Sequence, residues 1–180
     1  METHRLTAHP AHPPLQVSGV EARVIGRDAD WLRVRWRVEA SGRLVVPVFA
    51  GRGRADGLWK TTCFELFLRP EGGGAYSELN LSPSERWAAY DFTGYREGMS
   101  ERPASREPDC TMRVGSSFAI FDAAIPADLV PDAQSAANFA AVIEEEGGVL
   151  SYWALAHPAE KPDFHDPACF VATLAAPDRP

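Results

Sequence analysis

The sequence predicts an all-β protein, a jelly-roll-like antiparallel β-sandwich, from two observations. The first is a strict alternation of apolar and polar residues, clearest at residues 31–38, which is typical of a strand with one buried face. The second is a series of short β-type runs separated by Gly- and Pro-rich turns such as GRGRADG at 51–57 and RPEGGG at 69–74. Regular short strands with little helix favour a sandwich or barrel.

The elements follow from these signals in chain order. Residues 1–14, METHRLTAHPAHPP, are rich in His and Pro, and we expect a flexible arm ahead of a single domain at 15–176. Pro47 makes the run around it an edge strand or a bulge. Only residues 127–130 and 132–137 hint at short helix. We expect strands at residues 20–25, 31–38, 44–49, 62–68, 76–82, 87–92, 117–125, 139–144, 149–155 and 169–174.

Composition narrows the class of protein. The chain has 180 residues, enough for one well-packed core, and a formal net charge of -7, which argues against a nucleic-acid or anionic-membrane partner. No apolar run approaches the roughly 20 residues that span a bilayer. The N-terminus does not read as a secretory signal, and Cys63, Cys110 and Cys169 show no zinc spacing. We therefore expect reduced thiols and a cytoplasmic location.

The most informative stretch is residues 58–92, which predicts three consecutive strands joined by tight turns. If RPEGGG forms a hairpin, Glu65, Glu78 and Asn80 lie together on an exposed sheet face. Either Tyr90 with Arg86, or Trp87 with Asp91, would extend that face. Two carboxyls on adjacent strands suit glycoside hydrolysis, but polar residues there are equally expected of a sheet face that only binds. We favour binding without turnover.

Two further groups are candidate ligand contacts. One proline-bounded loop contains His157, Lys161 and His165. This loop is either a rigid connection or a ligand contact. A metal site is the least favoured interpretation, because the residues do not have a known ligand spacing. Trp59 and Lys60 immediately precede the first of the three strands expected in residues 58–92. A tryptophan in that position either stacks on a sugar ring or plugs the end of the sandwich. The arginines on residues 31–38 are best explained as a solvated face. No phosphate-binding, zinc-protease or serine-hydrolase motif is present.

At this point the chain resembles bacterial DOMON-like proteins, which are related to the family 9 carbohydrate-binding modules. The resemblance rests on LWKTTCFELFL at 58–68, YSELNLSPSERWAAYDFTGYREGM at 76–99 and SYWALAHPAEKPDFHDPACF at 151–170, and extends over about residues 15–174. It implies a sandwich of two antiparallel sheets with a ligand cleft formed by one sheet and its loops.

Members of this wider group bind sugars or haem. The resemblance implies stacking by Trp59, Trp87 or Trp153, with Glu65, Glu78 and Asn80 bonding sugar hydroxyls. For haem it implies Met99 or Met112 with His157 or His165 as axial ligands, although no motif matches residue by residue.

The sequence therefore predicts a non-catalytic protein that binds a carbohydrate or related small polar ligand, without a metal and without a required cofactor. A haem-binding or redox module is the alternative, and a glycoside-active enzyme using Glu65 and Glu78 comes third. A protein partner stays open. The predicted ligand-binding residues are Trp59, Lys60, Glu65, Glu78, Asn80, Trp87, Tyr90, Trp153, His157, Lys161 and His165.

Overall fold

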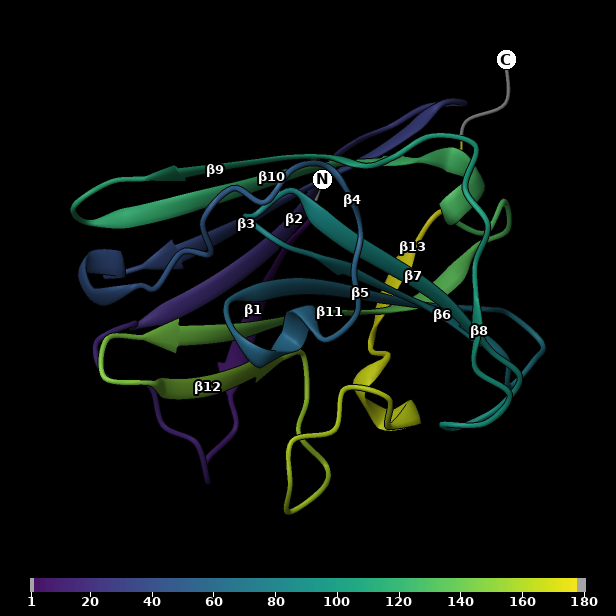
Figure 1. The fold of residues 1–180 in the computed structure, drawn as a ribbon. Coiled ribbons are helices and arrows are strands. Elements are labelled where there is room, and N and C mark those ends of the chain that lie inside the picture. The colour runs from purple at the N-terminus through teal and green to yellow at the C-terminus, as the bar shows by residue number, and fades with distance from the viewer. Residues whose placement is uncertain (1, 178–180) are drawn as a thin grey trace.

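The fold is a β-sandwich, seen in a computed structural model that describes residues 2–177 (Figure 1). Strands are joined edge to edge in one continuous sheet that curls into two layers, and every neighbouring pair is antiparallel except β4 with β7. The first leaf, in spatial order, comprises β1 (Thr3–Ala8), β2 (Gly19–Arg27), β3 (Trp31–Glu39), β10 (Phe118–Pro126) and β9 (Asp109–Val114).

The second leaf carries the features that matter for function. It comprises, in spatial order, β4 (Gly53–Arg54), β7 (Arg86–Phe92), β6 (Tyr76–Leu81), β5 (Cys63–Pro70), β11 (Ser135–Glu145) and β12 (Val149–Ala154), with β8 (Ser100–Glu101) beside β7 and β13 (Ala172–Leu174) beside β11. Short 3-10 turns interrupt the connections at η1 (Ser41–Arg43), η2 (Leu58–Lys60), η3 (Ala127–Leu129) and η4 (Pro167–Cys169).

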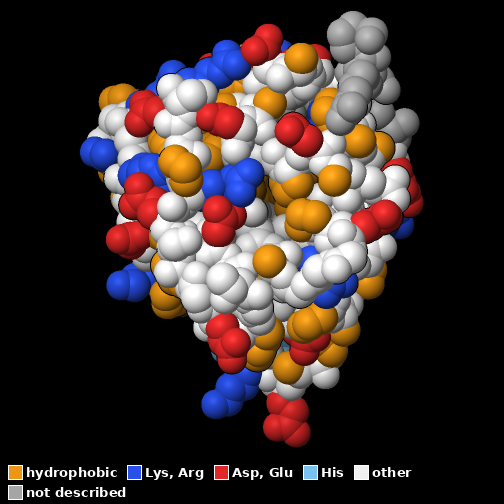
Figure 2. Space-filling model, turned by 90° about the vertical axis from the view of Figure 1, so that its right-hand side faces the viewer, with side chains coloured by type: hydrophobic (Ala, Val, Ile, Leu, Met, Phe, Trp, Pro, Cys, Tyr) orange, Lys and Arg blue, Asp and Glu red, His pale blue; other side chains and the backbone are white. Residues whose placement is uncertain are grey.

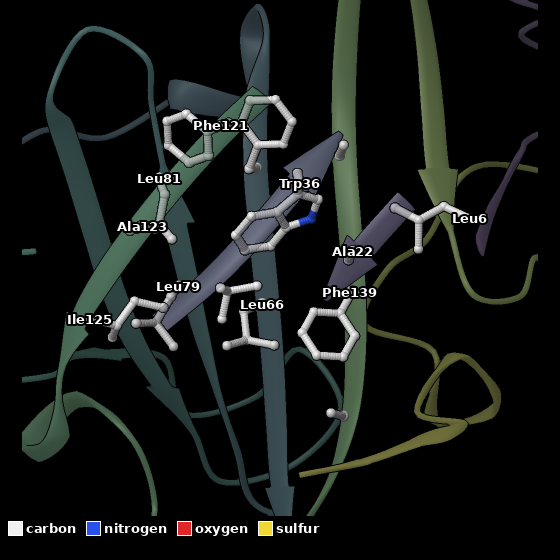
Figure 3. Packing of buried hydrophobic residues seen from close by; sticks show 14 of the residues in the cluster. Leu6, Ala22, Trp36, Leu66, Leu79, Leu81, Phe121, Ala123, Ile125 and Phe139 are labelled. Atoms are coloured by element: carbon white, nitrogen blue, oxygen red, sulfur yellow. The ribbon is translucent and has the colours of Figure 1, made fainter. Parts of the chain in front are cut away.

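The main core lies between the two leaves because each strand turns its apolar residues inward. Trp36 of β3 packs against Phe64, Phe121 and Phe139 from three other strands, and Figure 3 shows Trp36 between Phe121, Leu66 and Phe139. The rings of Phe64 and Phe121 stack with centroids 4.3 Å apart, so the leaves meet directly. This interdigitation is what holds a sandwich together.

The N-terminal segment differs from the flexible arm that we expected. Thr3–Ala8 form β1, which pairs with β2 through residues 3–6 and with β12 through Thr7 and Ala8. The segment therefore links the two leaves at one edge of the sandwich. Its only strongly apolar residue, Leu6, is 5% exposed, and a single buried leucine among polar residues gives too weak a pattern to announce a strand.

Most predicted strands are present, with small shifts at their ends, but three predictions are wrong. Residues 44–49 form a loop in which only Leu44 makes an isolated bridge, to Glu145, and Val48 and Phe49 are exposed. Residues 135–137 belong to β11 and not to a helix. The last strand is shorter than expected, because η4 and an irregular stretch occupy residues 167–171. Strand β9 was not predicted.

The surface is polar and carries charges of both signs. The arginine face of β3 is ion-paired, with Arg35 donating to Asp122 at 2.7 Å and Arg33 to Asp28 at 2.6 Å. Figure 2 shows Lys and Arg side chains intermixed with Asp and Glu over the face that it views. Among the described residues, no helix has the length and apolar character needed to cross a bilayer.

Candidate functional site

The candidate site lies on the outer face of the second leaf, opposite the main core. Alternation along β5 and β6 places Phe64, Leu66 and Leu79 in the main core and turns Glu65, Glu78 and Asn80 outward. The register sets Glu65 directly opposite Asn80, and Glu78 between Phe67 and Tyr90. The hairpin and the shared face predicted from RPEGGG are therefore present.

A second apolar cluster covers part of this outer face. Phe67, Tyr76 and Phe92 pack there against Phe164 and Phe170 from the segment after β12, which Figure 1 shows in yellow-green below the second leaf. That segment is pinned from below, since the fully buried Asn138 side chain donates to the Phe164 carbonyl at 3.1 Å and accepts from the Leu155 N–H. The Cys169 thiol also bonds the carbonyl of Ala156 at 3.2 Å.

The uncovered part of the face is a cleft of about 790 Å³, a size that suits a small organic ligand. Its floor is made by the outward residues of the strands, and its walls come from the loop around η2, the loop after β7 and the segment after β12. The cleft is lined by His12, Asp56, Gly57, Trp59, Glu65, Glu78, Asn80, Tyr90, Phe92, Arg96, Met99, Val142, Tyr152, Lys161, Pro162, Phe164 and His165.

A chain of hydrogen bonds fixes one side of the floor. The Asn80 amide donates to Glu78 Oε1 at 2.8 Å, and Glu78 Oε2 lies 3.6 Å from Nε2 of His165. The Tyr76 hydroxyl accepts from the Arg96 N–H at 3.2 Å and lies 2.7 Å from Nδ1 of His165.

Burial disfavours charge on the groups of this floor. Loss of solvation lowers the pKa of His165 to about 4, with Arg96 contributing in the same direction, so the imidazole is neutral. Burial raises the pKa of Glu78, although the bond from Asn80 offsets part of the change. Burial, followed by repulsion from Glu78, raises the pKa of Glu65 well above its ordinary value.

Two floor groups lack partners within the described part of the chain. The Glu65 side chain is 3% exposed and makes no hydrogen bond or ion pair to any residue between 2 and 177. The Oδ1 atom of Asn80, directly across the ladder, is buried and has no donor. Buried polar atoms are normally satisfied, so an unpaired acceptor and an unpaired carboxyl side by side indicate a place where a ligand group binds.

The mouth of the cleft is aromatic and charged. Trp59 of η2 is 51% exposed and lines one wall, and Tyr152 of β12 lines the floor beside Val142. Arg96 donates to Asp163 at 2.8 Å, and Asp163 also accepts from the Tyr95 hydroxyl. Tyr90 donates to Asp56, and burial together with that bond raises the pKa of Tyr90. These contacts tie the walls to the floor.

Seven of the predicted ligand-binding residues line the cleft in the structure, and four lie outside it. Trp87 and Trp153 face the main core and are 3% and 5% exposed, so neither can stack on a ligand in the cleft. His157 Nε2 lies 2.8 Å from the Thr7 carbonyl, away from the lining, and Lys60 is exposed beside the Trp59 ring. The residues that line the cleft are Trp59, Glu65, Glu78, Asn80, Tyr90, Lys161 and His165.

One expectation about the carboxyls is wrong. Glu65 and Glu78 lie on the predicted face, but they are 3% and 7% exposed, so the face is covered and not open to solvent. The covering segment after β12 and the η2 loop are the reason, because their packing cannot be deduced from alternation alone. The same difficulty concealed Asp56, Arg96 and Tyr152, whose only sequence signal is their position in a loop or on an alternating strand.

The predicted haem ligands are mostly far from one another. Met112 lies on β9 of the first leaf and packs against the main core, and His157 bonds the β1 backbone. Met99 and His165 both line the cleft, but there a macrocycle would meet Glu65, Glu78 and Asn80 as buried polar neighbours. Among residues 2–177, no group of three His, Cys, Asp or Glu side chains is arranged to hold a metal ion.

Comparison with known proteins found structures of similar fold but no match in sequence. No family model matches the chain, and no curated protein matches it. Among solved structures, a candidate carbohydrate-binding protein from Bacteroides uniformis is similar with a TM-score of 0.65 at 17% identity, covering 98% of this chain and 86% of the other.

A family 9 carbohydrate-binding module from Caldicellulosiruptor kristjanssonii is also similar. Its complex with cellotriose gives a TM-score of 0.60 at 11% identity over 99% of this chain and 84% of the module. Its complex with glucose gives 0.53 at 11% identity over 98% and 86%. At these identities the likeness shows that the chain has the β-sandwich fold of these carbohydrate-binding proteins.

Proposed function

We propose that this protein is a non-catalytic binding protein for a carbohydrate, held in the cleft on the outer face of the second leaf. The observation that carries the proposal is the pairing of an unsatisfied polar floor with an aromatic mouth. Glu65 and the Asn80 Oδ1 atom offer hydrogen bonds that no described residue uses, and Trp59 presents a half-exposed ring above them. Sugars have hydroxyls for the first and an apolar ring face for the second.

The fold comparison supports the same ligand class. The modules of similar structure were solved with glucose and cellotriose bound, and the cleft volume of about 790 Å³ leaves room for one or two sugar rings. The residues that we propose as contacts are Trp59 and Tyr152 for the ring faces, and Glu65, Glu78 and Asn80 for the hydroxyls.

Binding without turnover follows from the state of the two carboxyls. A glycosidase divides the work between one protonated acid and one ionised nucleophile or base, which requires environments that separate the two pKa values. Burial raises the pKa of Glu65 well above its ordinary value and raises that of Glu78 in the same direction, although the bond from Asn80 and the charge of Arg96 offset part of the change at Glu78, so burial favours neither carboxyl as an ionised nucleophile. We expect no hydrolysis of chromogenic glycosides.

The test is titration calorimetry against glucose, cellobiose, amino sugars and N-acetylated sugars. For the sugar that binds, Trp59→Ala should weaken the affinity about tenfold through loss of stacking, with no change in melting temperature beyond about 1 °C, because the ring is half exposed. Trp31→Ala is the matched control, since Trp31 lies on β3 of the other leaf. Absence of binding by every sugar, or equal losses in both variants, would refute the proposal.

Four narrower proposals accompany it. We infer that the cleft does not take haem as its ligand, and a Soret shift with haemin that depends on His165 would overturn this. The relationship to DOMON-like proteins and the jelly-roll connectivity stay proposals that rest on the residues quoted above. The cytoplasmic location is likewise a proposal, which subcellular fractionation tests.

A further inference from the structure

We propose that the floor of the cleft selects a ligand carrying a protonated amine, and hence that an amino sugar is the carbohydrate class that this site binds best. This inference rests on the proposed function, because it concerns the same cleft. The floor of the cleft offers hydrogen-bond acceptors to which the described chain supplies no donor.

The floor is composed almost entirely of hydrogen-bond acceptors. Glu65 and Asn80 are cross-strand partners, and Glu78 is two residues from Asn80 on the same face of β6. The Asn80 amide is already used by Glu78 Oε1, which leaves the Asn80 Oδ1 atom and the Glu65 carboxyl without donors. A group that brings several donors to one point satisfies both, and an ammonium carries three.

The floor also lacks a positive charge. The titratable and charged groups that face the two carboxyls from the surrounding elements are Cys63, Tyr76, Tyr90, Arg96 and His165. Of these, Arg96 is engaged by Asp163, and His165 is neutral because burial lowers its pKa to about 4. Ionised carboxyls are costly to bury, so burial favours the protonated form of both, and Arg96 offsets only part of this effect at Glu78.

A ligand ammonium changes this balance. The cation sits next to one carboxyl, which ionises to form a charge-assisted pair, and the carboxyl proton leaves to solvent. The exchange is balanced: one neutral carboxyl and one ammonium become an ion pair and one released proton. A neutral hydroxyl in the same place gives a hydrogen bond but no ion pair and releases no proton.

The experiment compares glucosamine, glucose and N-acetylglucosamine by calorimetry at about pH 6, where a free amine is protonated and burial of Glu65 and Glu78 favours their neutral forms. We expect glucosamine to bind about tenfold or more tightly than both others, because the acetylated amine keeps a donor but loses the charge. The binding enthalpy, measured in buffers of different ionisation enthalpy, should report release of about one proton for glucosamine and none for glucose.

Glu65→Gln should abolish the preference, bringing the ratio of glucosamine to glucose affinity to about one. Glu78→Gln serves the same purpose if the first variant does not fold. Glu146→Gln makes the same chemical replacement at an exposed carboxyl in the β11–β12 turn and should keep the ratio. Glucose binding as tightly as glucosamine without proton release would overturn the inference and leave the proposed function standing. Failure of all three sugars to bind would count against the proposed function itself.

Discussion

At the scale of single residues, the two floor carboxyls make stability depend on pH in an unusual direction. Burial raises the pKa of Glu65 in the folded protein above that of the unfolded chain. Its contribution to stability is therefore complete below the ordinary glutamate pKa of about 4.3 and is lost as pH rises through the raised value. Burial raises the pKa of Glu78 in the same sense.

We therefore predict that Glu65→Gln stabilises the ligand-free protein at about pH 8 and changes little at about pH 5. A gain of about 1 kcal/mol corresponds to a rise in melting temperature of roughly 2–4 °C for a chain of this size. Thermal denaturation at both pH values measures the difference, with Glu146→Gln as the control. A melting temperature that falls equally at both values would mean that Glu65 is needed for packing rather than held against its ionisation.

The tryptophans show why site residues are only partly predictable from the sequence. Trp153 follows Tyr152 on β12, and alternation sends one to the core and the other to the cleft, without saying which. Trp87 shares its face with Ala89, and that face proved to be the inner one. Glu65, Glu78 and Asn80 were predictable because they interrupt faces whose opposite sides are wholly apolar, over two strands joined by a recognisable turn.

At the scale of elements, strands with long hydrophobic patterns were predicted correctly, whereas segments whose structure depends on pairing with a neighbouring strand were not. Strands β3, β5 and β6 are indicated by apolar residues at alternate positions, and β10 by a nine-residue run that is apolar except for Asp122. The unpredicted strand β9 reads DCTMRV, in which three polar residues alternate with three apolar ones, and it pairs with β10 along one edge. Residues 44–49 are apolar enough for a strand but include Pro47, which has no N–H for a ladder.

Strand β1 yields a prediction that separates a structural strand from a loose arm. Leu6→Ala should lower the free energy of unfolding by about 2–4 kcal/mol, because Leu6 is 5% exposed within the main core. Leu15→Ala, at 49% exposure, should cost less than about 0.5 kcal/mol. Urea denaturation followed by far-UV circular dichroism compares the two. Equal and negligible effects would show that residues 3–8 do not contribute to the folded sheet.

The segment after β12 yields a second prediction, about how the cleft wall is positioned. Asn138→Ala removes the buried donor to the Phe164 carbonyl and should cost about 1–3 kcal/mol of stability. Because Phe164 and His165 line the cleft, sugar affinity should fall about fivefold as well, and hydrogen exchange in residues 156–170 should accelerate. Asn138→Asp, which keeps the acceptor but loses the donor, should have the same effect on the wall. Lower stability with unchanged sugar affinity would mean that Asn138 does not help to position the cleft wall.

At the scale of the whole molecule, the sandwich uses the two faces of one leaf for different purposes. The inner face of the second leaf packs on the first leaf in the main core, and the outer face carries the second apolar cluster and the cleft. Ligand contacts thus stand on strands that the main core already holds rigid. Such a support keeps unsatisfied groups in position without letting the floor collapse around them.

The leaves are also joined through a buried carboxylate, which leads to a prediction about cooperativity. Glu145 of β11 is fully buried, and its oxygens accept the N–H groups of Leu15, Gln16 and Val17, which precede β2, at 2.6–2.9 Å. Glu145→Ala should therefore cost about 3 kcal/mol or more, since three buried donors lose a charged acceptor. Glu146→Ala, one residue further and exposed, should cost less than about 0.5 kcal/mol.

The form of the transition tests how far the two leaves act as one unit. Continuous pairing through β1 and the shared main core predict a single unfolding transition, with tryptophan fluorescence and far-UV circular dichroism coinciding in both the parent protein and Glu145→Ala. Ligand binding to the second leaf should then raise the stability of the entire chain, because the leaves cannot unfold separately. Two separated transitions in Glu145→Ala would instead mean that each leaf is stable without the other, and that the ligand protects only the leaf that binds it.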